Sequence, residues 1–385
     1  MPIRTTSDPK PERDKSGEHE SSEPRFHRRV IEDLGSGELR RSIEKDLREV
    51  YRFYVDDQDR VELATIHPSK RWFHIAMWMV KNSVLHLTPG RRIMLLVAGL
   101  LFVNGIGGPG WSMVLAFLDI FVILMLELKD KLMAQDELET GRAVQAALMP
   151  RDSPRLSGWD VWLYTRSANQ VGGDLVDYIQ LDDDRVGVAI GDVAGKGLGA
   201  ALYMARLQST LRALAPLFES RGALGTEING IFRRDGLADR FVSLLYLELE
   251  RNTDRVAYLN AGHFPPLIVR SDRVDTAARG SAAIGIVNDP VFKDQELRLS
   301  VGDVAVLYSD GVTEARDDEG DFFGDERFLA HLRRMHNLPA ETVGRRILSY
   351  VDVFVGDAPQ TDDLSIIIIR RTADQPALPA PRPAD

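Results

Sequence analysis

Gly191-Asp192-Val193-Ala194-Gly195-Lys196-Gly197 follows directly on the apolar run at residues 186–190. A short apolar run that ends at glycines predicts a buried β-strand, here with Asp192 at its carboxyl end. The glycines beside Asp192 carry no Cβ, so a metal ion, a water or a phosphate can come close to the backbone. The stretch therefore predicts a strand end at which a carboxylate takes part in chemistry.

Two other interpretations of the glycine motifs fail on spacing and residue type. Gly195-Lys196 looks like part of a phosphate-binding loop, but the pattern GxxxxGK[ST] is absent, since Gly191 lies four rather than five positions before Gly195. The GGD motif at residues 172–174 resembles one of the diguanylate-type nucleotide cyclases. Leu175 and Val176 stand where that motif has an acidic and an aromatic residue. Neither interpretation is retained.

Three further motifs place aspartates beside predicted strands: Gly172-Gly173-Asp174, Ser309-Asp310-Gly311 and Thr361-Asp362-Asp363. A single Asp-Gly pair is usually a plain turn, but four such motifs at strand ends need another explanation. Buried like charges repel and raise one another's pKa unless positive charge compensates them. Mg²⁺ and Mn²⁺ suit an all-oxygen site, and a pair of such ions can activate a water. The motifs therefore predict a two-metal site.

From about residue 158 onward, short β-rich runs alternate with turns and a few helices. Consecutive runs are often too close for crossover helices, so the sheets should be mainly antiparallel. Two packed sheets covered by helices are expected. The predicted strands are residues 161–164, 186–190, 242–249, 256–259, 267–269, 304–308 and 364–370, and the predicted helices are residues 198–217, 224–234, 327–335 and 342–354.

Composition excludes several classes of protein. The chain has 385 residues, enough for two or three folded units, and 44% of them are hydrophobic. Its formal net charge of -10 argues against nucleic acid as a partner, because phosphate binding needs a basic surface. The absence of cysteine excludes disulfides, thiolate zinc sites and cysteine nucleophiles.

The first half of the chain is organised differently. Residues 1–25 and 372–385 are polar and proline-containing, which predicts disordered tails. Residues 26–90 show helical periodicity, with no secretory signal peptide before them. Residues 129–149 predict a connector helix that ends at Pro150. Its imperfect heptads favour a homodimer formed through the N-terminal region and the connector.

Residues 91–128 are the most apolar part of the chain, with two hydrophobic runs at 93–103 and 111–126. A glycine-rich stretch at 104–110 predicts a turn between them. Each run is short for a membrane span, and Asp119 is costly in lipid, so a buried hairpin in a soluble domain stays open as an alternative. Basic residues flank both ends, which favours two transmembrane helices with both ends in the cytoplasm. The expected location is the cell membrane with a cytoplasmic catalytic domain; the alternative is a cytoplasmic protein.

Six motifs in order carry a family resemblance: QAALMP (145–150), GGDLVD (172–177), GDVAGKGLGAAL (191–202), NAGHFPP (260–266), YSDGVTEARD (308–317) and TDDLSIIII (361–369). Together they resemble the sporulation-phosphatase (SpoIIE-like) branch of the PPM, or protein phosphatase 2C, serine/threonine phosphatases. The resemblance covers residues 145–371. It implies an αββα sandwich of two mainly antiparallel sheets over residues 150–371, two Mn²⁺ or Mg²⁺ ions, and no covalent nucleophile.

The resemblance also implies roles for individual residues. Asp192 would bridge both metal ions, with the Val193 carbonyl on one of them and Asp174 on the second. Asp310 and Asp362 would hold the first ion, although Asp363 could exchange roles with Asp362. The arginine that grips phosphate in animal relatives has no counterpart in the motifs.

His263 lies in the NAGHFPP motif, at a predicted turn between strands. It is a candidate either for a structural role in that turn or for a general acid.

The resemblance implies a phosphoprotein substrate, of the anti-sigma-factor antagonist kind. Two alternatives remain: a catalytically inactive signalling module with the same fold, and a membrane-tethered scaffold whose N-terminal region carries the main function. Retention of the aspartates at every metal motif argues against the inactive module.

Overall fold

The computed structural model describes residues 77, 81–108, 110–150, 152–236 and 240–373. The tail expected at residues 1–25, most of the helical region expected at 26–90 and the chain beyond residue 373 lie outside this part. The chain divides into two compact units, Met1–Leu128 and Lys129–Asp385.

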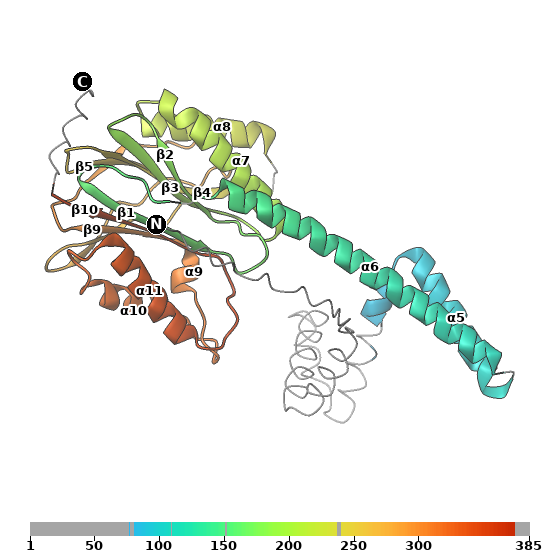
Figure 1. The fold of residues 1–385 in the computed structure, drawn as a ribbon. Coiled ribbons are helices and arrows are strands. Elements are labelled where there is room, and N and C mark those ends of the chain that lie inside the picture. Colours follow the sequence, from blue (N-terminus) through green and yellow to red (C-terminus); the bar gives the residue numbers. More distant parts are fainter. Residues whose placement is uncertain (1–76, 78–80, 109, 151, 237–239, 374–385) are drawn as a thin grey trace, which may run out of the picture. The chain divides into compact units, whose positions relative to one another are not determined.

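Two five-stranded sheets form the second unit (Figure 1). The first sheet has the order β1-β10-β9-β6-β7 and the second the order β2-β3-β4-β5-β8, and neighbouring strands are antiparallel throughout. The strands of the first sheet are β1 Trp159–Arg166, β6 Leu267–Val269, β7 Val274–Thr276, β9 Val304–Tyr308 and β10 Leu364–Arg371. Those of the second are β2 Leu175–Gln180, β3 Arg185–Val193, β4 Val242–Glu250, β5 Arg255–Ala261 and β8 Gln295–Arg298.

Each sheet is buried on both faces, and the alternation of side chains along one strand shows why. In β10, Ile367 and Ile369 pack into the core between the two sheets, whereas Ile366 and Ile368 pack against the helices outside. Successive strand residues point to opposite faces, so a continuous isoleucine run supplies both cores. Strand β4 does the same for the second sheet.

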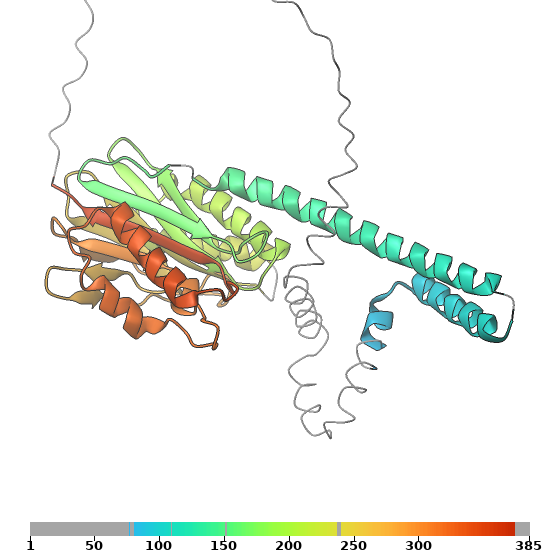
Figure 2. The ribbon, with the colours of Figure 1, turned by 60° about the horizontal axis from the view of Figure 1, so that its bottom comes forward.

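Helices cover the two outer faces and complete four layers, confirming the predicted αββα sandwich (Figures 1 and 2). Helix α7 Leu198–Leu214 with the 3₁₀ turn Ala215–Leu217 and helix α8 Arg221–Asp235 cover the second sheet. Helices α10 Gly324–Leu332 and α11 Ala340–Val355 cover the first, and α9 Asp310–Thr313 is a single turn after β9. A Cβ at Gly344 would overlap the Trp162 ring, so this glycine lets α11 lie directly on β1.

The apolar region forms a helical hairpin in the first unit. Helix α5 spans Pro89–Gly107 and α6 spans Trp111–Leu148. The turn is shorter than the expected 104–110, because α5 continues through Gly107. Arg91 Nη1 donates to Glu127 Oε1 at 2.7 Å, which ties the start of α5 to α6. The second apolar run and the predicted connector form one continuous helix.

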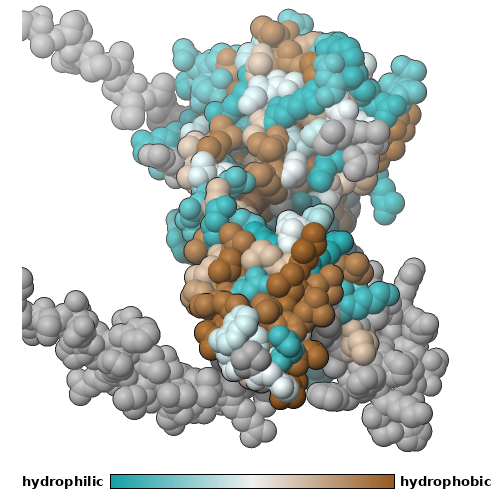
Figure 3. Space-filling view, turned by 90° about the vertical axis from the view of Figure 1, so that its right-hand side faces the viewer, coloured by the Kyte–Doolittle hydropathy of each residue, from teal (hydrophilic) through white to brown (hydrophobic). Residues whose placement is uncertain are grey.

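The hairpin exposes large apolar side chains that a folded soluble core would cover. Leu100 on α5 is 72% exposed and Phe117 on α6 is 69% exposed. Figure 3 shows apolar side chains gathered on the face turned to the viewer, over the end of the hairpin. Both helices are long and apolar enough to cross a membrane. This exposure is unlike the buried hairpin considered as the alternative.

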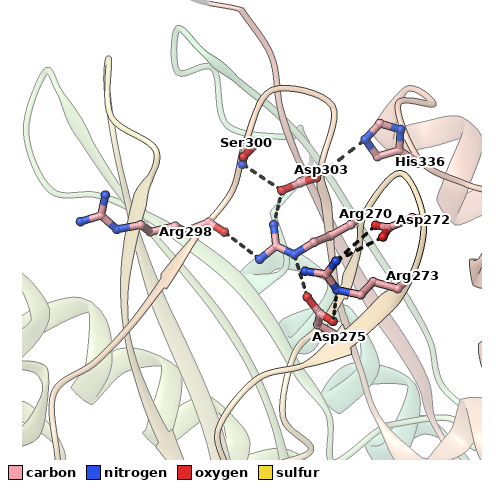
Figure 4. Close-up of polar contacts among 8 residues, drawn as sticks. All are labelled: Arg270, Asp272, Arg273, Asp275, Arg298, Ser300, Asp303 and His336. Carbon is pink, nitrogen blue, oxygen red and sulfur yellow. Dashed lines mark hydrogen bonds and ion pairs between the residues drawn. The ribbon is translucent and has the colours of Figure 1, made fainter.

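A network of ion pairs holds the turn between β6 and β7 against the start of β9 (Figure 4). Asp303 is buried just before β9, where its carboxylate accepts hydrogen bonds from Arg270 Nη1 and from the Ser300 backbone N–H. Arg270 also donates to Asp275 at 2.7 Å. Removing this buried carboxylate is costly, because Arg270 then loses one of its two carboxylate partners and the Ser300 N–H loses its acceptor.

We expect Asp303→Ala to lower the free energy of unfolding by about 2–4 kcal/mol, because Arg270 loses one of its two carboxylate partners and the Ser300 amide loses its acceptor. Urea unfolding of the full chain, followed by tryptophan fluorescence, measures this. Asp272→Ala is the matched control: this aspartate pairs only with Arg273, is 67% exposed and should change stability by less than about 0.5 kcal/mol. Equal losses in both variants would contradict the assignment.

Candidate metal-dependent active site

The aspartates predicted from the four motifs come together from both sheets. Asp192 lies in β3 opposite Ser243, and Asp174 immediately precedes the neighbouring strand β2. Asp310 directly follows β9, and Asp362 closely precedes β10 in the other sheet. Because β9 and β10 are antiparallel neighbours, the end of one meets the start of the other. Two strand pairs, one from each sheet, therefore deliver carboxylates to one end of the sandwich.

The electrostatics of these carboxylates show that they face one another. Burial, followed by the charges of Asp310 and Asp362, raises the pKa of Asp192 to about 7. Burial and then the Asp192 charge raise the pKa of Asp174 well above its ordinary value. Burial followed by Asp362 raises the pKa of Asp310. Such mutual repulsion calls for positive charge at this end of the sandwich.

The space and the donor atoms around Asp174 fit a hard cation. Oδ2 of Asp174 is buried and has no hydrogen-bond partner within the part of the chain that the structure describes. A Cβ at Gly173 would lie 3.2 Å from the Val193 carbonyl oxygen and 3.5 Å from Asp192 Oδ1. Glycine thus keeps open the space beside two oxygens that the family resemblance assigns to metal. All the donors are oxygens, as Mg²⁺ and Mn²⁺ prefer.

The two adjacent aspartates of the TDD motif have different surroundings. Asp363 is buried, and its carboxylate accepts backbone N–H groups of Ala168 at 2.8 Å and Gly173 at 2.6 Å. Both its oxygens therefore hold the loop that carries Asp174. The Asp362 carboxylate is partly exposed and accepts from Lys196 Nζ at 3.0 Å.

The carboxylates do not yet surround one point. Among the described residues, no three acidic, histidine or cysteine side chains lie close enough together to hold one metal ion as they stand. The contacts give the reason for two of them, since Lys196 holds Asp362 and backbone amides hold Asp363. The residues fit a divalent cation by chemistry and burial, while closing the coordination shell requires side-chain movement.

His263 is buried next to this cluster rather than exposed to a substrate. Its Nδ1 is 2.8 Å from the Ser243 hydroxyl, and that hydroxyl accepts from the Asp192 backbone N–H at 3.2 Å. The Asn260 side chain accepts from the His263 N–H and donates to its carbonyl, which closes the turn. Burial lowers the pKa of His263 to about 4, so the imidazole is neutral at pH 7. These contacts are those of a turn residue that supports Asp192.

Sequence reasoning missed three residues that border the site. Gln145 donates from Nε2 to the Gly172 carbonyl at 2.8 Å and accepts from the Gly172 N–H at 3.1 Å. Ser243 links Asp192 to His263, and Lys196 pairs with Asp362. Gln145 and Lys196 lie within quoted motifs, so their position was a usable signal. Ser243 follows Phe241 and Val242 and lies in no motif. Only the pairing of β3 with β4 shows that it lies opposite Asp192.

Comparisons with known proteins identify relatives of this chain. The family model described as Stage II sporulation protein E matches residues 182–372. Phosphoserine phosphatase RsbU of Bacillus subtilis is 27% identical over 241 residues, covering 62% of this chain and 70% of RsbU. Protein IcfG of Synechocystis is 26% identical over 266 residues, covering 61% of this chain but only 41% of IcfG. The chain thus spans about two fifths of that relative.

The fold has a solved counterpart as well. The PP2C domain of SiaA from Pseudomonas aeruginosa superposes with a TM-score of 0.56 at 21% identity, covering 63% of this chain and 98% of that domain. At this identity the match supports the fold, and the family model and the curated relatives support the kind of domain. Residues 182–372 therefore match the SpoIIE family model, within a domain that has the fold of the PP2C serine/threonine phosphatases.

Proposed function

We propose that the chain hydrolyses phosphoserine or phosphothreonine in a partner signalling protein, with divalent cations at the carboxylate cluster. The observation that carries this is the meeting of Asp174, Asp192, Asp310 and Asp362 from two sheets, three of them with raised pKa values. Two relatives are named phosphoserine phosphatases, which supports the same substrate chemistry. A substrate of the anti-sigma-factor antagonist kind remains part of the proposal.

Two Mn²⁺ or Mg²⁺ ions, when bound, would lower the pKa of a water and neutralise phosphoryl oxygens. Asp192 would serve both ions and the Val193 carbonyl one of them. Asp310 and Asp362 would hold the first ion, and Asp174 would help to hold the second. Water attacks phosphorus, the ester P–O bond breaks, and the serine or threonine hydroxyl leaves with a proton. We assign Asp363 to holding the Asp174 loop and His263 to positioning Asp192, since both Asp363 carboxylate oxygens accept backbone N–H groups and His263 Nδ1 pairs with the Ser243 hydroxyl.

The competing proposal is an inactive signalling module with the same fold. The observation in its favour is that no three potential metal ligands converge among the residues that the structure describes. Hydrolysis of a generic aryl phosphate with and without Mn²⁺ separates the two, because only the enzyme shows metal-stimulated turnover. A version beginning at Gln145 should be assayed beside the full chain, in case the N-terminal region holds the domain inactive.

Asp192→Asn or Asp310→Asn should reduce metal-stimulated hydrolysis by about 100-fold or more, since each removes charge that a cation needs. Without divalent cations, Asp192→Asn should raise the free energy of unfolding by about 1–3 kcal/mol near pH 8. The pKa of Asp192 in the folded chain is about 7, above its ordinary value of 3.8. The wild type is therefore most stable below pH 3.8, where Asp192 is protonated in both the folded and the unfolded chain. This stability is lost as pH rises through about 7, where the folded chain has to hold Asp192 charged.

Turnover of the aryl phosphate and thermal unfolding at pH 4 and pH 8 test both statements. The control is Asp289→Asn, an exposed aspartate far in sequence from the four aspartate motifs. Near-normal turnover in the Asp192 or Asp310 variant would refute the metal assignment. A stability gain that is equally large at pH 4 would refute the electrostatic explanation.

We also propose that α5 and the first part of α6 anchor the chain in a membrane, with the catalytic domain in the cytoplasm. Their length, apolar surface and basic flanks support this. The full chain should sediment with membranes and need detergent for extraction, whereas the version beginning at Gln145 should remain in the soluble fraction. Recovery of the full chain as a monodisperse protein without detergent would refute the anchor.

The connector is proposed to pair two copies of the chain and to bias the active site. Leu132 and Met133 on α6 are each 52% exposed, which supports a partner helix. At the end of the helix, Gln145 grips Gly172, and the Gln208 side chain of α7 donates to the Leu148 carbonyl at 2.8 Å. The connector therefore touches both the loop before Asp174 and the helix after Asp192.

Inserting Gly-Pro after Glu139 should break the connector and change aryl-phosphatase activity by about fivefold or more, a typical size for coupling between sites. The insertion should also shift the protein from dimer to monomer in light scattering. A double alanine replacement of Glu139 and Thr140 keeps the helix and serves as the control. If the insertion variant, the full chain and the version beginning at Gln145 share one activity and one oligomeric state, the connector is a passive tether.

A further inference from the structure

Lys196 places an ammonium group at the edge of the carboxylate cluster. Its Nζ donates to Asp362 Oδ2 at 3.0 Å and to the Thr361 carbonyl at 2.9 Å. Its charge also acts on Asp310, whose pKa it lowers in part. Lys196 lies only four residues after Asp192, on the loop that leads into α7. One lysine therefore connects the β3 loop of the second sheet to the aspartates of the first.

We propose that Lys196 is an internal counter-ion that competes with a divalent cation for Asp362 and, once displaced, compensates the charge of the substrate phosphate. Asp362 cannot serve the ammonium and a metal ion with the same oxygen, so a cation that binds there has to replace this contact. The inference rests on the proposed metal-dependent function and adds a residue that the family motifs did not assign.

The charge balance explains why the displaced lysine would turn to phosphate. Two divalent cations neutralise the four carboxylates of Asp174, Asp192, Asp310 and Asp362. A bound phosphoryl group adds up to about two further negative charges. The positive charge of the two ions is already balanced by the four carboxylates. Lys196 then provides positive charge on a flexible stem beside Asp192. This would fill the place of the arginine that the motifs lack.

Ordinary surface pairing is the competing explanation, since the Lys196 and Asp362 side chains are 58% and 42% exposed. Exposed pairs are worth little, so the expected effect on affinity is modest. Arg240 provides the matched comparison. Its Nη1 donates to the Ala194 carbonyl at 3.1 Å, and its guanidinium packs against Gly195 of the same loop, but it pairs with none of the site aspartates.

The test measures Mn²⁺ binding to the full chain by isothermal titration calorimetry, for the wild type, Lys196→Met and Arg240→Gln. Lys196→Met should bind Mn²⁺ about two- to fivefold more tightly, because the competing ammonium is gone. Arg240→Gln should stay within about twofold of the wild type, since it removes a nearby charge without freeing Asp362. At saturating Mn²⁺, inorganic phosphate should inhibit aryl-phosphate hydrolysis several-fold more weakly in Lys196→Met than in the wild type.

The outcomes separate the ideas. Unchanged or weaker Mn²⁺ binding in Lys196→Met overturns the competition, and so does equal tightening in Arg240→Gln, which would show only a general effect of charge. Unchanged inhibition by phosphate overturns the second role of the lysine. If the wild-type chain binds no Mn²⁺ at all, the proposed metal-dependent function fails instead. Thermal unfolding of each variant without metal confirms that a change in binding does not reflect misfolding.

Discussion

Repulsion among buried carboxylates is the constraint around which the catalytic domain is built. Asp192 and Asp174 come from one sheet and Asp310 and Asp362 from the other. The Asp192 charge raises the pKa of Asp174, the Asp310 and Asp362 charges raise that of Asp192, and the Asp362 charge raises that of Asp310. A fold would not gather these charges for stability, because their desolvation is costly and only Asp362 pairs with a cation, Lys196. The sandwich tolerates these carboxylates because its two large apolar sheets supply stability elsewhere. The unfavourable desolvation and repulsion are confined to one end of the sandwich, where cations can enter.

Hydrogen bonds from neighbouring residues hold these carboxylates in place. Asp363 fixes the loop before β2 through two backbone amides, and Ser243 with His263 supports the backbone of Asp192. A Cβ at Gly172 would lie 2.5 Å from Asp363 Oδ2, so the loop can approach that carboxylate only with glycine there.

The same loop is where the rest of the chain reaches the site. Gln145 at the end of α6 pairs with both polar groups of the Gly172 backbone, and the Gln208 side chain of α7 donates to the Leu148 carbonyl of the same helix. Hydrogen bonds depend on distance and angle more steeply than apolar contacts do. A small shift of α6 would therefore alter the Gln145 pair and, with it, the position of the loop at Gly172. The family resemblance began at this glutamine, and the structure gives that boundary a physical meaning.

The sequence by itself determined the layers, the strands with continuous apolar runs and the four aspartate motifs, because burial periodicity and strand-end glycines are local signals. It did not reveal β2, β7 or β8, whose short or polar runs, such as Gln295–Arg298, become strands only by pairing with neighbours. Nor could it separate Asp362 from Asp363, adjacent in the chain and alike in chemistry. Only the tertiary structure decided that one faces Lys196 and the other the backbone of a loop some 190 residues away, because contacts between distant segments depend on how the two sheets pack.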